Sequence, residues 1–234
     1  MRNRFFIPML AFTVVLMAIA LYMTFLWVPA DFTQGDVQRI FYFHLGSFWT
    51  ASVALTLNAL ACLMYILRRM DRAKAEFWDA LAASSAEIGV IFCAGGLAFG
   101  TFWAKPVWGT WWVWDARLTL TFLTWLLYIA YLLLRGFLEG SDRAGMISAV
   151  YGIFAIAAVP MVYMSNRWFR TQHPQPVIGG GEGSGMPGSM WLTVFAAWFA
   201  MQALMCWYLT QRMPLERGKR EAERLRRQLR VEDV

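Results

Sequence analysis

The sequence predicts an all-α protein that crosses a membrane six times, and three observations support this. Hydrophobic residues make up 59% of the 234 residues, whereas a soluble domain has about 45–50%. The mean hydropathy is +0.46. Apolar runs close to the roughly 20 residues that a spanning helix needs recur along the chain.

Six apolar runs supply the expected spans. The first begins after Arg2 and Arg4 as a secretory signal would, but it is longer than a signal's apolar core of about 7–15 residues and lacks a small-residue cleavage site. We therefore expect it to remain as a helix. Pro160 predicts a kink near the outer end of the fifth span. The expected spans are residues 5–28, 41–67, 80–103, 118–134, 146–164 and 190–209.

The charges predict the orientation. If both termini are cytoplasmic, the inner segments 1–4, 68–79, 135–145 and 211–234 hold 16 of the 21 lysines and arginines, as the positive-inside rule requires. The external side keeps only Arg39, Lys105, Arg117, Arg167 and Arg170.

Two units follow from this layout: a six-helix transmembrane domain over residues 1–210 and a basic cytoplasmic tail over residues 211–234. The tail carries a thin apolar stripe of Ala222, Leu225 and Leu229, so we favour a helix near anionic lipid headgroups over a docking site for a cytoplasmic partner. The net charge of +6 then requires no nucleic acid.

Two kinds of chemistry are disfavoured by the sequence. The three cysteines Cys62, Cys93 and Cys206 fall inside expected spans and form no C-x-x-C pair, which argues against thiol redox chemistry and a structural zinc site. The sequence has no P-loop, so any ATP hydrolysis belongs to a partner.

The two histidines are candidate metal ligands. His44 lies at the outer end of the second span and His173 in the external loop 165–189, so both are expected at one membrane surface. Neutral imidazoles from two segments are able to ligate one haem iron. If the histidines are considered alone, we favour a simpler interpretation. His44 would be a hydrogen-bonded residue at the membrane interface, and His173 would be an ordinary loop residue.

The external segment 103–117 shifts that interpretation towards haem. Five tryptophans within twelve positions exceed what membrane anchoring requires, and they form a surface suited to a flat apolar ligand. Gly109 permits a turn. Lys105 and Arg117, with Arg167 and Arg170, are placed to meet anionic groups. The tryptophans are Trp103, Trp108, Trp111, Trp112 and Trp114.

Three further features deserve mention, and the roles of two of them are left open by the sequence. Asp115 precedes the fourth span, where it caps the helix, orders an indole N–H or anchors a basic residue. Glu87 lies at membrane depth and is either functional or a packing residue. The glycine-rich run 179–185 predicts a flexible loop that lets the His173 segment move.

Three motifs together resemble the CcmC family, called haem exporter protein C. Trp108-Gly-Thr-Trp-Trp-Val-Trp-Asp-Ala-Arg117, preceded by Lys105-Pro106, is similar to the tryptophan-rich signature of the haem-handling superfamily. The segments Arg39–His44 and Trp168–His173 are similar to those that carry the family's histidine ligands. The likeness covers nearly the whole chain.

The resemblance implies a function beyond what spacing shows. His44 and His173 would be the axial ligands of a non-covalent b-type haem at the periplasmic side of the bacterial cytoplasmic membrane. The 108–117 segment would be the haem platform and the contact surface for the haem chaperone CcmE. The resemblance also implies the partners CcmA, CcmB and CcmD, which would form an ABC transporter complex with this subunit. The subunit itself would not be an enzyme.

Three alternatives remain at this stage. A haem-delivery synthase of the CcsA or CcmF kind has a similar segment but more spans and histidines. A transporter or scaffold subunit without a cofactor would use the aromatic surface for lipid or a partner. A membrane enzyme using Glu87 and Asp115 is disfavoured because the two carboxyl groups stand in different settings.

Overall fold

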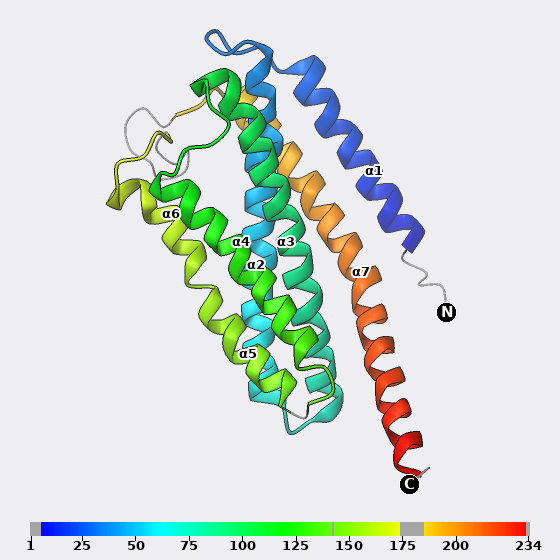
Figure 1. Cartoon of the computed structure of the whole chain (residues 1–234). Helices are drawn as coiled ribbons and strands as arrows, with labels where there is room; N and C mark the ends of the chain where they lie inside the picture. The colour runs from blue at the N-terminus through cyan, green and yellow to red at the C-terminus, as the bar shows by residue number, and fades with distance from the viewer. Residues whose placement is uncertain (1–5, 142, 174–184, 233–234) are drawn as a thin grey trace.

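The computed structural model describes residues 6–141, 143–173 and 185–232, and every long element in them is a helix (Figure 1). The expected glycine-rich loop 179–185 lies outside the described residues except for Gly185. The elements are α1 (Phe6–Tyr22), the π-helix η1 (Met23–Trp27), the 3₁₀ helix η2 (Asp36–Arg39), α2 (Ile40–Arg68), α3 (Arg72–Trp108), α4 (Ala116–Phe137), α5 (Ala144–Ala155), α6 (Ala158–Trp168) and α7 (Gly188–Glu232).

Six helical segments in the described residues are long and apolar enough to cross a membrane, which confirms the number of predicted spans. They match the six predicted runs in order, and most extend beyond them by a few residues at one or both ends. The segments are Phe6–Trp27, Asp36–Arg68, Arg72–Trp108, Ala116–Phe137, Ala144–Trp168 and Gly188–Ala222.

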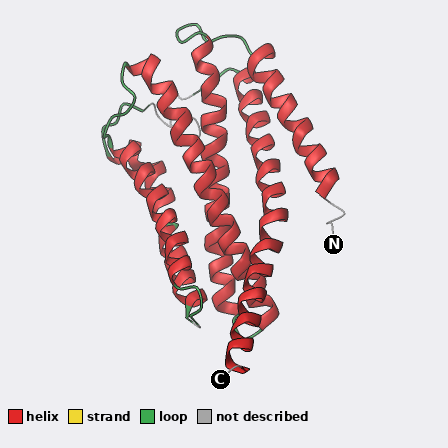
Figure 2. Cartoon of the chain, turned by 45° about the vertical axis from the view of Figure 1, so that its right-hand side comes forward, coloured by secondary structure: helices red, strands yellow, loops and turns green. Residues whose placement is uncertain are grey.

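Helices α2 and α3 form the most extensive pair and stand at the centre of the bundle. Helix α7 packs against α1, α2 and α3, while α4 packs against α3, α5 and α6 (Figures 1 and 2). The two chain ends point toward one end of the bundle (Figure 1), here called the termini end. The opposite end, which carries η2 and the link between α3 and α4, is called the site end.

Helix α3 extends past its predicted end at residue 103. Lys105 and Trp108, expected in the link after this span, are therefore helical, as is Trp103 at the predicted end. The helix stops only where Gly109 adopts a left-handed φ of 76° and donates its N–H to the Lys105 carbonyl, a conformation that glycine adopts without strain. Hydropathy alone did not reveal this continuation, because tryptophan and lysine also suit a membrane interface.

The fifth span is interrupted between α5 and α6, at residues 156–157. Pro160 has no N–H to donate to the carbonyl of Ile156, and the chain around the break uses shorter-range bonds from Ala157 N to Phe154 O (3.2 Å) and from Val159 N to Ile156 O (3.1 Å). The break lies near the middle of the span, so the predicted position near the outer end is wrong.

Helix α7 continues from the last span through residues 211–232 without a break, and it projects beyond the other helices at the termini end (Figures 1 and 2). Ion pairs attach the first part of this extension to the bundle. Lys219 Nζ lies 2.7 Å from Glu139 Oε1, and Arg220 pairs with Asp79. The predicted contact of the tail with lipid headgroups stays a prediction.

Glu87 forms an ion pair across two helices. Its Oε2 accepts a hydrogen bond from Nε of Arg212, so the predicted third span on α3 is joined to the start of the predicted tail on α7. Of the two interpretations left open by the sequence, this contact favours a packing role.

Candidate functional site

His44 lies in the second turn of α2 and faces α3. Its Nδ1 is 2.9 Å from the carbonyl oxygen of Gly96. A carbonyl only accepts hydrogen bonds, so Nδ1 carries the proton and Nε2 keeps a free lone pair. Gly100 allows this approach, because a Cβ at Gly100 would lie 2.7 Å from Cε1 of His44. The imidazole is therefore fixed in the tautomer that suits a metal ligand.

Aromatic side chains surround the His44 ring. Phe48 meets it edge to face at a centroid distance of 5.0 Å, and Trp103 does so at 5.8 Å. The Trp103 indole N–H donates to Oε1 of Gln34 at 2.8 Å, which ties the first external loop to this part of the site.

His173 follows α6 and is held by the start of α4. Its Nδ1 lies 3.3 Å from Oδ2 of Asp115, and Trp108 packs edge to face on the ring at 5.0 Å. Because the carboxylate accepts the Nδ1 proton, Nε2 is again left with a lone pair. The side chain is only 19% exposed.

Asp115 has two structural roles. Its Oδ1 accepts the backbone N–H of Leu118 at 2.8 Å and caps α4, which confirms the predicted cap. Its Oδ2 accepts the backbone N–H of Gln172 at 3.2 Å as well as the His173 proton. The same carboxylate thus joins the tryptophan-rich link to the segment that carries His173.

The environment of His173 keeps its imidazole neutral near pH 7. Burial lowers the pKa of His173 below its ordinary value of 6.5, repulsion by the Arg117 guanidinium lowers it further, and Asp115 opposes both effects. A neutral imidazole is the form that ligates a metal.

Both histidines lie at the site end. The His44 ring packs against Trp103 and the His173 ring against Trp108, two residues in the last turns of α3. The structure thus brings side chains from α2, α4 and the segment after α6 into one region, although they are far apart in the sequence.

Arg117 is a partly buried residue whose Nη1 is buried and has no hydrogen-bond partner among the described residues. The indole N–H of Trp112, in the adjoining link, is likewise buried without a partner in the described part of the chain. A buried N–H group without a partner is costly. Two such donors from the tryptophan-rich link and the start of α4 suit a carboxylate group of a ligand.

The other basic residues of the site end differ from Arg117. Arg39 pairs with Asp36 and donates to the carbonyls of Thr24 and Val28, so it secures the end of the first span. Lys105 donates to the Gly109 carbonyl at 3.0 Å. Arg167 and Arg170 stand beyond α6 or at its end.

Four of the five tryptophans form two pairs, and Trp112 packs beside the second pair. Trp103 and Trp108 of α3 contact the histidine rings, as described above. Trp111 and Trp114 are 51% and 72% exposed, and they contact Phe102 and Trp112, respectively. The first pair lines the site and the second forms an exposed aromatic rim on the protein.

Sequence reasoning missed several residues that shape the site: Gln34, Phe48, Gly96, Gly100 and Gln172. The pair Gly96 and Gly100 has the spacing of a close helix contact, so this signal was present in the sequence. Gln34 and Gln172 carry no such signal, because their roles depend on how the external loops fold.

These groups fit haem. The site offers two imidazoles with free Nε2 atoms, two unpaired N–H donors and aromatic walls. Haem has an iron that takes axial imidazoles, two carboxylates and a flat apolar ring, so each feature has a matching partner.

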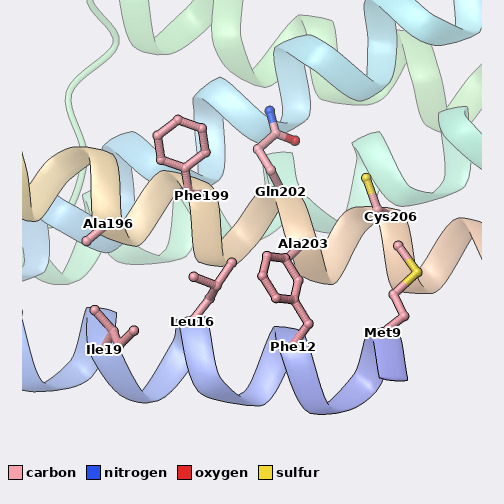
Figure 3. Close-up of a pocket in the computed structure, with 9 residues that line it drawn as sticks. All are labelled: Met9, Phe12, Leu16, Ile19, Ala196, Phe199, Gln202, Ala203 and Cys206. Atoms are coloured by element: carbon pink, nitrogen blue, oxygen red, sulfur yellow. The ribbon is translucent and has the colours of Figure 1, made fainter. Parts of the chain in front are cut away.

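A concave feature lies away from these residues. An apolar groove of about 560 Å³ runs between α1 and α7 (Figure 3), and none of its lining residues belongs to the site above. Met9, Phe12 and Leu16 project from α1 toward α7. In a membrane, such a lining suits hydrocarbon and offers little for chemistry.

Comparisons with known proteins find a matching family and several similar sequences. The profile of the family described as "Heme exporter protein C" matches residues 1–228. The chain is 28% identical to "Heme exporter protein C" of Haemophilus influenzae, over 93% of this chain and 87% of that protein. It is 32% identical to the Escherichia coli (strain K12) protein of the same name, over 72% and 67%. A "Putative cytochrome c biosynthesis ccmC-like mitochondrial protein" of Marchantia polymorpha is 29% identical, over 77% and 74%.

Proposed function

Because the chain belongs to the heme exporter protein C family, we propose that it binds haem between His44 and His173 and presents it to a haem chaperone for cytochrome c maturation. The family and the six apolar helices support a role in haem handling at a membrane. The family name points to transport and handling rather than to catalysis.

The proposal rests on the observation that the two imidazoles are held in the same tautomer. Each uses Nδ1 as a donor within the protein, His44 to Gly96 and His173 to Asp115, and each keeps Nε2 for a ligand. Haem iron, when bound, supplies two axial positions that neutral imidazoles occupy. The protein would thereby hold a non-covalent b-type haem with two histidine ligands.

The remaining side chains hold the ligand's edges. Arg117 and Trp112 would donate to a propionate through their unpaired N–H groups. Trp103 and Trp108 would contact the ring, since they already pack on the histidines. The exposed rim of Trp111 and Trp114 would meet the chaperone CcmE.

The same proposal includes the cellular setting. Both termini would lie in the cytoplasm and the site on the periplasmic side of a bacterial cytoplasmic membrane, an orientation that the charge bias supports. CcmA and CcmB would supply ATP hydrolysis and a second membrane subunit, and CcmD would help to hold the assembly. Lipids would surround the six helices.

Chaperone loading tests this function directly. We expect His44→Ala and His173→Ala each to abolish covalent haem on co-expressed CcmE, measured by haem staining of membranes. Thr56→Ala is a matched control on α2, because its hydroxyl donates only to the Ser52 carbonyl of its own helix. Normal loading of CcmE by either histidine variant, at equal protein levels, would contradict the proposal.

A further inference from the structure

Four buried polar side chains lie between helices in the termini-end half of the bundle, apart from the histidines. They come from four helices: Asn58 of α2, Ser84 of α3, Tyr128 of α4 and Ser148 of α5. Each is at most 1% exposed. We call them the inner polar cluster. Asn58 Oδ1 and the three hydroxyl oxygens have no hydrogen-bond partner among the described residues.

Several contacts show that these side chains face a common region. The Asn58 amide donates to the Ala82 carbonyl at 2.8 Å, which places it beside Ser84 on α3. A Cβ at Gly152 would lie 3.0 Å from Asn58 Oδ1 and 2.7 Å from Cys62 Sγ. Ser148 precedes Gly152 by one turn and shares its face of α5.

Tyr128 completes the group from α4. It packs in the same buried cluster as Cys62, and its ring centroid lies 6.4 Å from that of Tyr131. The four helices therefore direct polar atoms at the same interior region, with Cys62 at its edge.

Such atoms need partners, because a membrane interior supplies none. Serine in a helix is able to donate to a carbonyl one turn earlier, as Ser85 does to Leu81 at 2.7 Å. The neighbouring Ser84 makes no such bond. Buried polar groups that the protein leaves unpaired are usually bonded to ordered water.

A chain of polar contacts leads from the cluster to the termini end. The Tyr131 hydroxyl lies 3.8 Å from Cys62 Sγ and 3.3 Å from Arg135 Nη1. Arg135 Nη1 donates in turn to Asp79 Oδ1 at 2.8 Å, and Asp79 pairs with Arg220 of α7.

Toward the site end, the chain of side-chain contacts does not continue along α4 in the described residues. Thr121 and Thr124 lie on the same face of α4, but their hydroxyls donate to carbonyls of their own helix, Arg117 O and Leu120 O, at 2.7 Å each. We propose that the inner polar cluster binds ordered water that exchanges with solvent at the termini end and not with the haem site.

Cys62 is a built-in reporter of this water, and Cys93 is its matched control. Cys93 is also buried, but it packs in an apolar cluster with Ala54, Phe92 and Met205. The experiment uses two variants of the full chain, Cys93→Ala/Cys206→Ala and Cys62→Ala/Cys206→Ala. Infrared spectra follow conversion of each remaining S–H to S–D after transfer to D₂O.

We expect Cys62 to exchange at least about tenfold faster than Cys93, because an apolar site exchanges only when the bundle opens. Asn58→Leu, which removes an acceptor and fills space, should slow Cys62 toward the rate of Cys93. Two results would overturn the proposal. One is equally slow exchange of both thiols, and the other is an exchange rate of Cys62 that Asn58→Leu does not change.

Thermal unfolding gives an independent test. If water bonds to Ser84, Ser84→Ala loses that interaction and lowers Tm more than Ser85→Ala, whose parent hydroxyl is already bonded to its own helix. If the cluster is dry, Ser84→Ala removes an unpaired polar atom and raises Tm, which would overturn the proposal. Haem binding should be unaffected in either case, so this test is separate from that of the proposed function.

Discussion

At the scale of single residues, the site depends on which nitrogen of each histidine is engaged. His44 donates from Nδ1 to a backbone carbonyl, and His173 donates from Nδ1 to a carboxylate. These contacts fix the orientation of both rings before any ligand arrives. Asp115 is therefore best described as a positioning residue, which acts on a ligand through His173.

Asp115→Asn tests this positioning role through the pKa of His173. Asparagine still caps α4, but the negative charge that raises the pKa of His173 is lost. In the haem-free protein we expect His173 to titrate below 6.5, and still lower in Asp115→Asn. Because the chain has two histidines, NMR of labelled imidazoles resolves the titration. A pKa that rises or stays the same would contradict the contact.

The same shift predicts how stability depends on pH. The unfolded chain binds the His173 proton near pH 6.5, whereas the folded protein binds it only at lower pH. The unfolded state therefore holds more protons below pH 6.5, and this residue's contribution lowers the stability as the pH falls further. Tm of the haem-free protein, measured over this range, should fall more in the parent than in His173→Gln.

Arg117 gives a prediction about the ligand's carboxylates. Haem dimethyl ester lacks free propionates, so the parent should bind it about 10–100-fold more weakly than haem, as expected for a lost charged hydrogen bond. Arg117→Gln should bind haem and the ester alike. Titration followed by visible absorption measures both affinities.

Lys105→Gln is the matched control for this experiment. Its Nζ donates to the Gly109 carbonyl, so the variant should discriminate between the two ligands as the parent does. If Arg117→Gln retained the parent's discrimination, the propionate would be bound by another residue, while the histidine site would still stand.

At the scale of helices, the sequence predicts where spans exist better than where they end. Long apolar runs are sufficient to locate six helices, because hydrophobic length decides which segments enter the bilayer. The end of α3 depends on one backbone conformation at Gly109, and the break near residue 156 depends on a missing hydrogen bond at Pro160. These local events leave little trace in average hydropathy.

The close packing of α2 on α3 predicts a strong effect of Gly100→Ala. The new methyl group would lie 2.7 Å from the His44 ring, so either the ring or the helix must move. We expect lower Tm and weaker haem binding, with a cost of about 1–3 kcal/mol in stability. Thermal unfolding and haem titration check the two effects.

Gly95→Ala is the control for this substitution. Gly95 lies on the same helix, five residues before Gly100, and a Cβ there would meet only Ser47 Oγ, at an ordinary 3.7 Å. Similar losses of haem binding in both variants would show that the loss does not come from the contact between Gly100 and His44.

At the scale of the whole molecule, pattern and structure agree on a six-helix bundle, but the candidate site depends on contacts that no pattern specifies. The sequence suggests that His44 and His173 share a membrane surface. That Asp115 would hold His173, and that Arg117 Nη1 would have no partner among the described residues while Lys105 has one, follows only from the folding of the loops at the site end.

The proposed orientation is testable with two labels. Phe32 is fully exposed in the loop between η1 and η2, so a cysteine introduced there should react with a membrane-impermeant thiol reagent from the periplasmic side of intact cells. A cysteine at Leu215, 62% exposed on α7, should react only after the cells are opened. The reverse pattern would invert the topology and place the histidines in the cytoplasm.

The central claim is that one haem iron is bound by His44 and His173 together. The most direct test is the visible spectrum of the purified protein beside His44→Gly and His173→Gly, with and without added imidazole. We predict a low-spin spectrum with two histidine ligands in the parent, its loss in each variant, and its return when imidazole replaces the missing side chain. A parent spectrum that survives both substitutions unchanged would contradict the claim, because the iron would then have other ligands.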